Sequence, residues 1–105
     1  MTYRVIFSPE AVEDLERLFD HLLERKLASA TGNPDLAEQA IESIRQACQF
    51  LAHSPFSCRK AGQGPFLREL IIPFGRSGYV ALFEIRDAHD VIVGAFRHQN
   101  ESDYH

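Results

Sequence analysis

Three consecutive runs of β-branched and aromatic residues, all between residues 66 and 98, constrain the fold of this chain most. The runs are Phe66–Ile72, Tyr79–Arg86 and Val91–His98, and each is bounded by Gly, Pro or Asp. Short polar or Gly-containing connections join them, at Pro73–Gly78 and Asp87–Asp90. Runs of this length with such boundaries predict three strands in an antiparallel meander.

The residues before this meander predict one more strand and two helices. Thr2–Phe7 alternates in the manner of a half-buried strand. Ser8-Pro9 is a helix start, because serine caps free N–H groups and proline fits the first helical position. Apolar residues at steps of three and four then predict a helix over Pro9–Leu27. Asn33-Pro34 repeats the start signal, and a second helix is predicted over Pro34–Ala52.

These elements predict an α+β fold in one domain spanning residues 1–105, in the order strand, helix, helix and three strands. We expect a long antiparallel helical hairpin on one face of a four-stranded sheet. His53–Pro65 is expected to be a loop, because it holds two prolines and two glycines. The middle strand has apolar residues on both faces, with Tyr79 and Phe83 on one and Val80 on the other. The second face lacks chain to cover it, which indicates a partner.

The charge of the chain is unevenly distributed. Its formal net value is −4, from 15 acidic and 11 basic residues. Broad nucleic-acid binders are usually basic, so the balance argues against that class, and sequence-specific DNA binding by this chain alone is not expected. Residues 1–53 hold 9 acidic and 5 basic residues, while residues 54–105 hold 6 of each. The acidity therefore lies on the helical half, and the arginines of the sheet half stay available for a ligand.

Several features indicate a cytoplasmic protein without membrane contact. The opening MTYRVIFSPE is too short and too polar for a signal peptide. No apolar run approaches the ~20 residues that span a membrane. Cys48 falls on a predicted helix face and Cys58 in the loop, without metal-type spacing, and we expect both to be reduced thiols.

Basic side chains recur among the apolar residues of the sheet half, and they are the candidate site. Arg68 is either a surface residue paired with a neighbouring glutamate, or a residue on the exposed face of the sheet that binds a carboxylate or phosphate of a partner. Arg76 is a solvated turn residue or a phosphate clamp, and Arg59-Lys60 is a soluble loop pair or a basic rim. Arg97-His98 is an anion-binding pair, unless His98 is a half-buried histidine bonded to a backbone carbonyl.

Catalytic and metal motifs are weak in this sequence. His98, Asp103 and His105 match no standard metal spacing, so no metal or cofactor is expected. Metal-independent RNA cleavage needs a base, an acid and a cation. His98, Tyr104 and the arginines supply these types, but no spacing fixes them relative to one another.

The sequence resembles the ParE/RelE superfamily of toxins from bacterial type II toxin–antitoxin pairs. The resemblance rests on the opening YRVIFSPEAVEDLERL, on Pro55 after the second helix, on LRELIIPF followed by GYVALFEI, and on the ending VIVGAFRHQNESDYH. It covers nearly the whole chain. It implies a small α+β fold, a cytosolic toxin, and a cognate antitoxin that wraps an extended or helical segment over the sheet and helices.

The superfamily splits by target, and the resemblance leaves the choice open. ParE-like members inhibit DNA gyrase, and the long hairpin, the ending Arg97-His98-Gln99 and the acidic balance favour this branch. RelE-like members cut mRNA on the ribosome, and the turn Arg76–Tyr79 and Tyr104 resemble that branch. A third possibility is a degenerate member that only binds its antitoxin or represses its own operon with it.

Each branch implies its own set of site residues. Residues expected to contact the target or the antitoxin are Arg59, Lys60, Arg68, Arg76, Tyr79, Arg97 and His98. If the protein is a nuclease, the catalytic candidates are Arg76, Arg97, His98 and Tyr104.

Overall fold

The structure is a computed structural model, and it describes residues 2–28, 36–74 and 77–99. The predicted strand, two helices and three strands follow one another in the predicted order, with two short 3-10 turns and a short additional strand between the second helix and the meander. The elements are β1 (Arg4–Phe7), α1 (Pro9–Ala28), α2 (Leu36–Gln49), η1 (Phe50–Ala52), η2 (Pro55–Ser57), β2 (Arg59–Lys60), β3 (Leu67–Phe74), β4 (Ser77–Ile85) and β5 (Asp90–His98). Asn33-Pro34, the predicted start of the second helix, lies outside the described residues.

The described strands form one mixed sheet in the order β1-β5-β4-β3-β2. The predicted antiparallel meander of β3, β4 and β5 is confirmed, and β1 pairs with β5 in parallel. The sheet has five strands rather than the predicted four, because β2 adds to the edge of β3. Sequence patterns missed β2 because two residues are too short to show alternation. Its pairs are Arg59 with Glu69 and Lys60 with Arg68.

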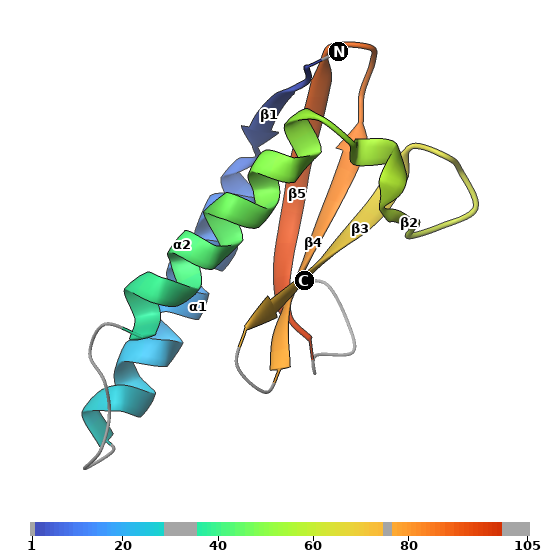
Figure 1. Cartoon of the computed structure of the whole chain (residues 1–105). Helices are drawn as coiled ribbons and strands as arrows, with labels where there is room; N and C mark the ends of the chain where they lie inside the picture. Colours follow the sequence, from blue (N-terminus) through green and yellow to red (C-terminus); the bar gives the residue numbers. More distant parts are fainter. Residues whose placement is uncertain (1, 29–35, 75–76, 100–105) are drawn as a thin grey trace.

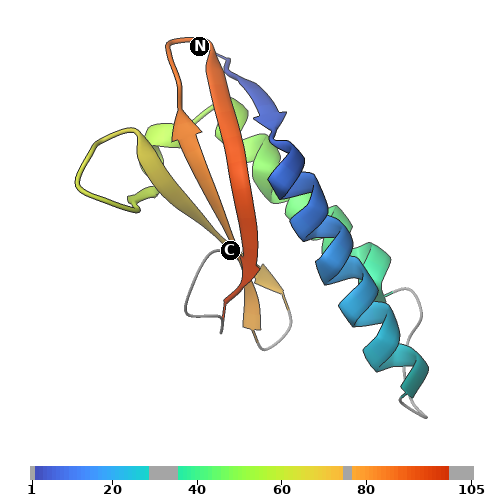
Figure 2. The ribbon, with the colours of Figure 1, turned by 180° about the vertical axis from the view of Figure 1, so that it is seen from behind.

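Both described helices cover the same face of the sheet, as predicted (Figure 1, Figure 2). α1 packs mainly on β5, α2 packs on β3, and the two helices contact each other. The hairpin runs past the end of the sheet, and the molecule is elongated, 48 × 26 × 24 Å along its principal axes. The second helix ends at Gln49, before the predicted Ala52, and η1 continues it as a tighter turn that buries Leu51.

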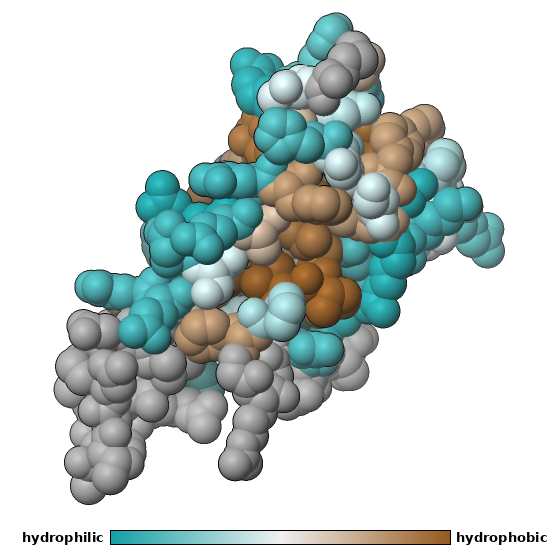
Figure 3. Space-filling view, in the orientation of Figure 1, coloured by the Kyte–Doolittle hydropathy of each residue, from teal (hydrophilic) through white to brown (hydrophobic). Residues whose placement is uncertain are grey.

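The core lies between this helical layer and the sheet. Its helical contribution has the expected 3–4 spacing, and its strand contribution alternates along β4. The buried residues include Ala11, Leu18, Ala40, Ile44, Cys48, Leu51, Ile72, Tyr79, Ala81, Phe83, Ile85, Val91, Val93 and Phe96. The apolar surface visible in Figure 3 gathers beside α2 and toward η2, while hydrophilic side chains cover the outside of the hairpin.

A β-bulge interrupts β5, and α1 is tied to it. Leu82 of β4 lies opposite Ala95 and the next residue, Phe83, lies opposite Val93, so Gly94 is the extra residue. The Ser8 hydroxyl donates to the Gly94 carbonyl oxygen at 3.1 Å.

Ser8 also caps α1, as the sequence predicts. Its Oγ accepts a hydrogen bond from the Ala11 N–H at 3.0 Å. One turn further along α1, an Asp14 carboxylate oxygen accepts the Phe96 N–H at 3.0 Å. These two polar side chains therefore bond to backbone groups that the irregular strand leaves outside its regular ladder.

We predict that Ser8→Ala lowers the free energy of unfolding by about 1–2 kcal/mol, because it removes the helix cap and the bond to Gly94 together. Urea denaturation followed by circular dichroism measures the change. Ser8→Asp is the control, since a carboxylate keeps the cap acceptor but cannot donate to the Gly94 carbonyl, and it should lose less. Equal stability of Ser8→Ala and the parent would contradict the assigned role.

Candidate binding face of the sheet

The sheet has a second face, here called the outer face, which is turned away from α1 and α2. Its members alternate with the core residues along each strand, according to the register of the sheet. They are Arg4 and Ile6 of β1, Arg59 of β2, Leu67, Glu69 and Ile71 of β3, Val80, Leu82 and Glu84 of β4, and Asp90, Ile92, Ala95 and Arg97 of β5.

The apolar surface of the outer face is most exposed along β3. Leu67 is 39% exposed and Ile71 is 37% exposed, whereas Val80, next to Ile71 on β4, is 1% exposed. Ala95 is buried, and Leu82 and Ile92 are half-buried. The uncovered apolar surface expected from the sequence is therefore a strip at the β3 side rather than the whole face.

Glu69 sits between two arginines at the centre of this strip. Its Oε1 lies 3.0 Å from the Arg59 Nε, and its Oε2 lies 3.9 Å from an Arg97 terminal nitrogen. The side chains of Glu69 and Arg97 are 14% and 13% exposed, so water screens their attraction less than at an open surface. Arg97 also donates to the backbone carbonyl oxygens of His98 and Gln99, each at 3.3 Å.

At the other side of the outer face, Arg4 is also matched by an acidic side chain. Its guanidinium donates to both carboxylate oxygens of Asp90, at 3.1 and 3.3 Å. The described arginines of this face thus each lie within ion-pair distance of a carboxylate. The face is apolar with compensated charges rather than broadly cationic, which corrects the expectation of freely available arginines.

Arg68 does not belong to this face, contrary to the prediction. It pairs in register with Phe83, a core residue, so it points to the side of the helices. Its guanidinium donates to three backbone carbonyl oxygens, of Pro65 at 2.7 Å, Phe56 at 3.0 Å and Cys58 at 2.6 Å. It also lies 5.2 Å from the centre of the Phe56 ring. Arg68 therefore holds η2 and the β2–β3 connection in place, and its partners are backbone carbonyls rather than the neighbouring glutamate considered from the sequence.

Arg97 and His98, adjacent in β5, lie on opposite faces of the sheet. Arg97 is opposite Val80 on the outer face, and His98 is opposite Tyr79 on the helical side. The His98 ring meets the Tyr79 ring edge-on, with centroids 5.7 Å apart at 89°. The Tyr79 ring is itself buried and lies 6.2 Å from Phe74. Tyr79 is thus a core residue, and its expected contact with the target or the antitoxin stays a prediction.

The remaining predicted residues divide between exposed and undescribed positions. Lys60 of β2 is exposed, and it lies opposite Arg68 of β3. Arg76 and Tyr104, and also Asp103 and His105, lie outside the described residues. Within residues 2–28, 36–74 and 77–99, His, Cys, Asp and Glu side chains form no group of three that could hold a metal. None of the described helices is long and apolar enough to cross a membrane.

Both cysteines are free thiols, as expected. Burial raises the pKa of Cys48 to about 12. Burial also raises the pKa of Cys58, and the positive charge of Arg68 acts in the opposite direction. Burial thus favours the neutral thiol over the more nucleophilic thiolate in both residues.

Sequence reasoning missed two residues of this region. Glu69 is one of them, although a carboxylate that alternates with apolar residues in a strand, as in Leu67–Ile71, is itself a signal in the sequence. Phe56 carries no local signal, because its contact with Arg68 depends on the fold of η2.

This chain is a small α+β protein in which a helical hairpin covers one face of a mixed sheet. The other face of the sheet is apolar and carries ion-paired arginines. The family model described as "ParE toxin of type II toxin-antitoxin system, parDE" matches residues 5–103. The chain therefore belongs to the ParE toxin family and is the toxin of a type II toxin–antitoxin system. Membership of this family implies a cognate antitoxin.

Two similar proteins accompany the family match. A curated relative, "Toxin RelE1" of Caulobacter vibrioides, is 34% identical over 85 residues, which are 81% of this chain and 82% of the relative. A solved structure titled "Chromosomal ParDE TA system from P. aeruginosa" superposes with a TM-score of 0.70 at 17% identity, covering 92% of this chain and 96% of the other. The structural match shows the shared fold.

We predict that Arg68→Ala lowers the free energy of unfolding by about 2–3 kcal/mol, because three carbonyl oxygens lose a charged donor and Phe56 loses its cation. Arg59→Ala, a matched arginine deletion in an exposed ion pair, should cost less than about 1 kcal/mol. Urea denaturation of both variants measures the difference. Equal losses would show that Arg68 is an ordinary surface residue.

Proposed function

We propose that this protein is a ParE-type toxin that inhibits DNA gyrase by binding it, and that its antitoxin holds it inactive. One observation carries the choice of a binding protein over a nuclease. Arg97 and His98 point to opposite sides of the sheet, with Arg97 beside Glu69 and His98 against Tyr79.

The chemistry of RNA cleavage explains why this separation matters. A base for the 2′-hydroxyl, an acid for the leaving oxygen and a cation must all reach one phosphate. Consecutive strand residues point to opposite faces, so Arg97 and His98 cannot serve the same phosphate without rearrangement of β5. The family model that matches the chain is that of ParE, which also supports the gyrase reading.

Ribosome-dependent mRNA cleavage is the second candidate function. It is favoured by the 34% identity to a protein named Toxin RelE1. In this reading Arg76 and Tyr104, which lie outside the described residues, would supply the cation and the acid or base. The third candidate, a degenerate member that binds only its antitoxin, retains the fold without either activity. All three candidate functions imply a cytoplasmic protein, because gyrase, ribosomes and an antitoxin would all be met there.

The antitoxin is proposed to cover the strip of Leu67 and Ile71 on the outer face with an acidic or amphipathic segment. The adjoining edge of β3 limits strand addition. At this edge the Leu67 carbonyl accepts a hydrogen bond from the Ala61 N–H, and Glu69 is paired with Arg59 of β2. The next residues whose backbone groups point to the edge are Ile71 and Pro73. Pro73 has no N–H to donate. A helix laid across the strip is therefore favoured over an added strand. A complex in which the antitoxin touches only the outer side of the helices would contradict this placement.

The test of the proposed target is a paired assay with purified toxin. We expect loss of DNA supercoiling by gyrase while mRNA in a translating extract stays intact. Cleaved mRNA with normal supercoiling would select the RelE-like activity, and neither effect would indicate a degenerate member. Toxin mixed with its antitoxin serves as the control and should be inactive in both assays.

Arg97→Ala is predicted to abolish growth arrest while the protein stays folded. The Arg97 side chain is only 13% exposed and lies 3.9 Å from Glu69, so some loss of stability, about 1–2 kcal/mol, should accompany the change. Arg4→Ala is the matched control, because Arg4 is an ion-paired arginine at the far side of the same face, and this variant should remain toxic. Induced growth curves and thermal denaturation measure both effects. Full growth arrest by folded Arg97→Ala would remove Arg97 from the site.

A further inference from the structure

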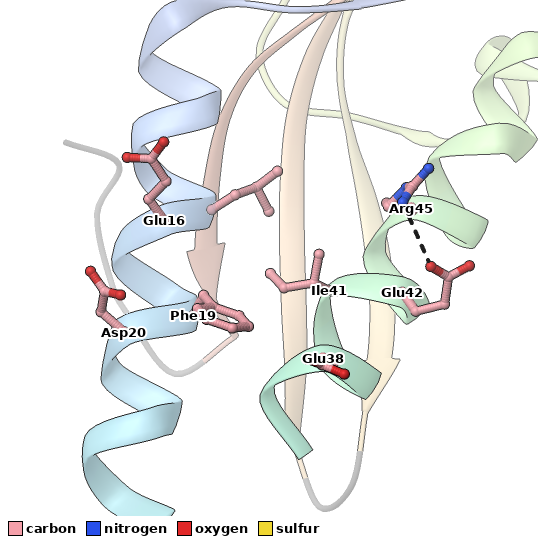
Figure 4. Close-up of a pocket in the computed structure, with 8 residues that line it drawn as sticks. Glu16, Phe19, Asp20, Glu38, Ile41, Glu42 and Arg45 are labelled. Carbon is pink, nitrogen blue, oxygen red and sulfur yellow. Dashed lines mark ion pairs between the residues drawn. The ribbon is translucent and has the colours of Figure 1, made fainter. Parts of the chain in front are cut away.

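A groove runs between α1 and α2 on the helical layer, separate from the outer face of the sheet (Figure 4). Its volume is about 550 Å³. Side chains from both helices line it, and the strands lie behind them in Figure 4. The proposed contacts with antitoxin or gyrase on the outer face do not use this groove.

The floor of the groove is apolar. Leu15 and Phe19 of α1 and Ile41 of α2 are half-buried, and Figure 4 shows Phe19 and Ile41 projecting toward each other between the helices. Leu15 and Ile41 also pack against the hydrophobic core, so their positions are fixed by the fold. The floor therefore offers a preformed apolar stripe that runs along the helix axes.

The rims of the groove are acidic on both sides. α1 contributes Glu16 and Asp20, and α2 contributes Glu38 and Glu42. In Figure 4 the carboxylates of Glu16 and Asp20 lie on the side of α1 that is away from α2, so they flank the groove rather than point into it. Among the lining side chains that the structure describes, Arg45 is the one basic residue, and it lies 3.9 Å from Glu42. Four carboxylates and one guanidinium give these described lining residues a formal charge of −3.

We propose that this groove binds an amphipathic helix of a partner protein that carries Lys or Arg beside its apolar stripe. A helix fits because the groove lies parallel to two helices and has an apolar floor. Cationic flanks fit because carboxylates stand on both rims, and the same carboxylates repel nucleic acid and anionic lipid. The acidic segment proposed for the outer face cannot serve here, so the two surfaces call for partner segments of opposite charge.

The probe is a synthetic helical peptide of about 18 residues, or five turns, with Leu at helical spacing and Lys at the flanking positions. Titration into isotopically labelled protein should shift the amide signals of Leu15, Phe19 and Ile41. Affinity should fall as salt is raised, because the flanking contacts are ionic. The same peptide with Glu in place of Lys should not bind.

Glu16→Lys and Glu13→Lys form a matched pair of variants. Both residues are exposed on α1 and both changes alter the net charge equally, but Glu13 is not among the residues that line the groove. Glu16→Lys should weaken peptide binding about fivefold or more, since one ion pair becomes a repulsion, and Glu13→Lys less than about twofold. Glu38→Lys tests the opposite rim and should behave as Glu16→Lys.

Several outcomes would overturn the proposal. Equal losses in Glu13→Lys and Glu16→Lys, or equal binding of a scrambled peptide, would show attraction by net charge alone. Shifts confined to the outer face would place the peptide elsewhere. The peptide must also bind the toxin–antitoxin complex, since its exclusion there would assign the groove to the antitoxin. Self-association of the free protein that Glu16→Lys abolishes would assign the groove to a second copy of this chain.

Discussion

The β-bulge at Gly94 decides which side chains of β5 face which way. Val91 and Val93, before the bulge, point to the helices, and a regular strand would continue with Ala95 and Arg97 on that side. The extra residue reverses the alternation, so Phe96 enters the core and Arg97 reaches the outer face. Ser8 and Asp14 hold the irregular backbone from the first turns of α1. The proposed binding face therefore depends on contacts made by the first helix.

Charge within the sheet half is largely matched inside the chain. Glu69 lies between Arg59 and Arg97, Asp90 meets Arg4, and Arg68 fastens backbone carbonyls beside Phe56. A partner that approaches the outer face meets an apolar strip with fixed ion pairs rather than an extended positive field. Such a surface recognises a partner by its shape and by replacing single internal ion pairs with ion pairs to that partner. These properties suit a protein partner better than the phosphate backbone of a nucleic acid.

The two layers of the molecule present opposite chemistry to the outside. The sheet exposes apolar residues of β3 among paired arginines, while the helical layer exposes a groove rimmed by carboxylates. The helices cover a single face of the sheet, and the outer face is the opposite one (Figure 2). Partner segments bound at the two proposed surfaces would therefore not overlap.

The sequence by itself determined the order of the elements, the first helix with its Ser8 cap, and the meander, since periodicity and end signals act over a few neighbouring residues. Family membership was also readable from motifs spread along the chain. Only the tertiary structure decided which face each arginine occupies. The bulge turned Arg97 outward, strand register turned Arg68 toward the helices, and β2 arose from pairing with β3. These outcomes rest on contacts between residues distant in the chain, such as Ser8 with Gly94, and local patterns carry no information about them.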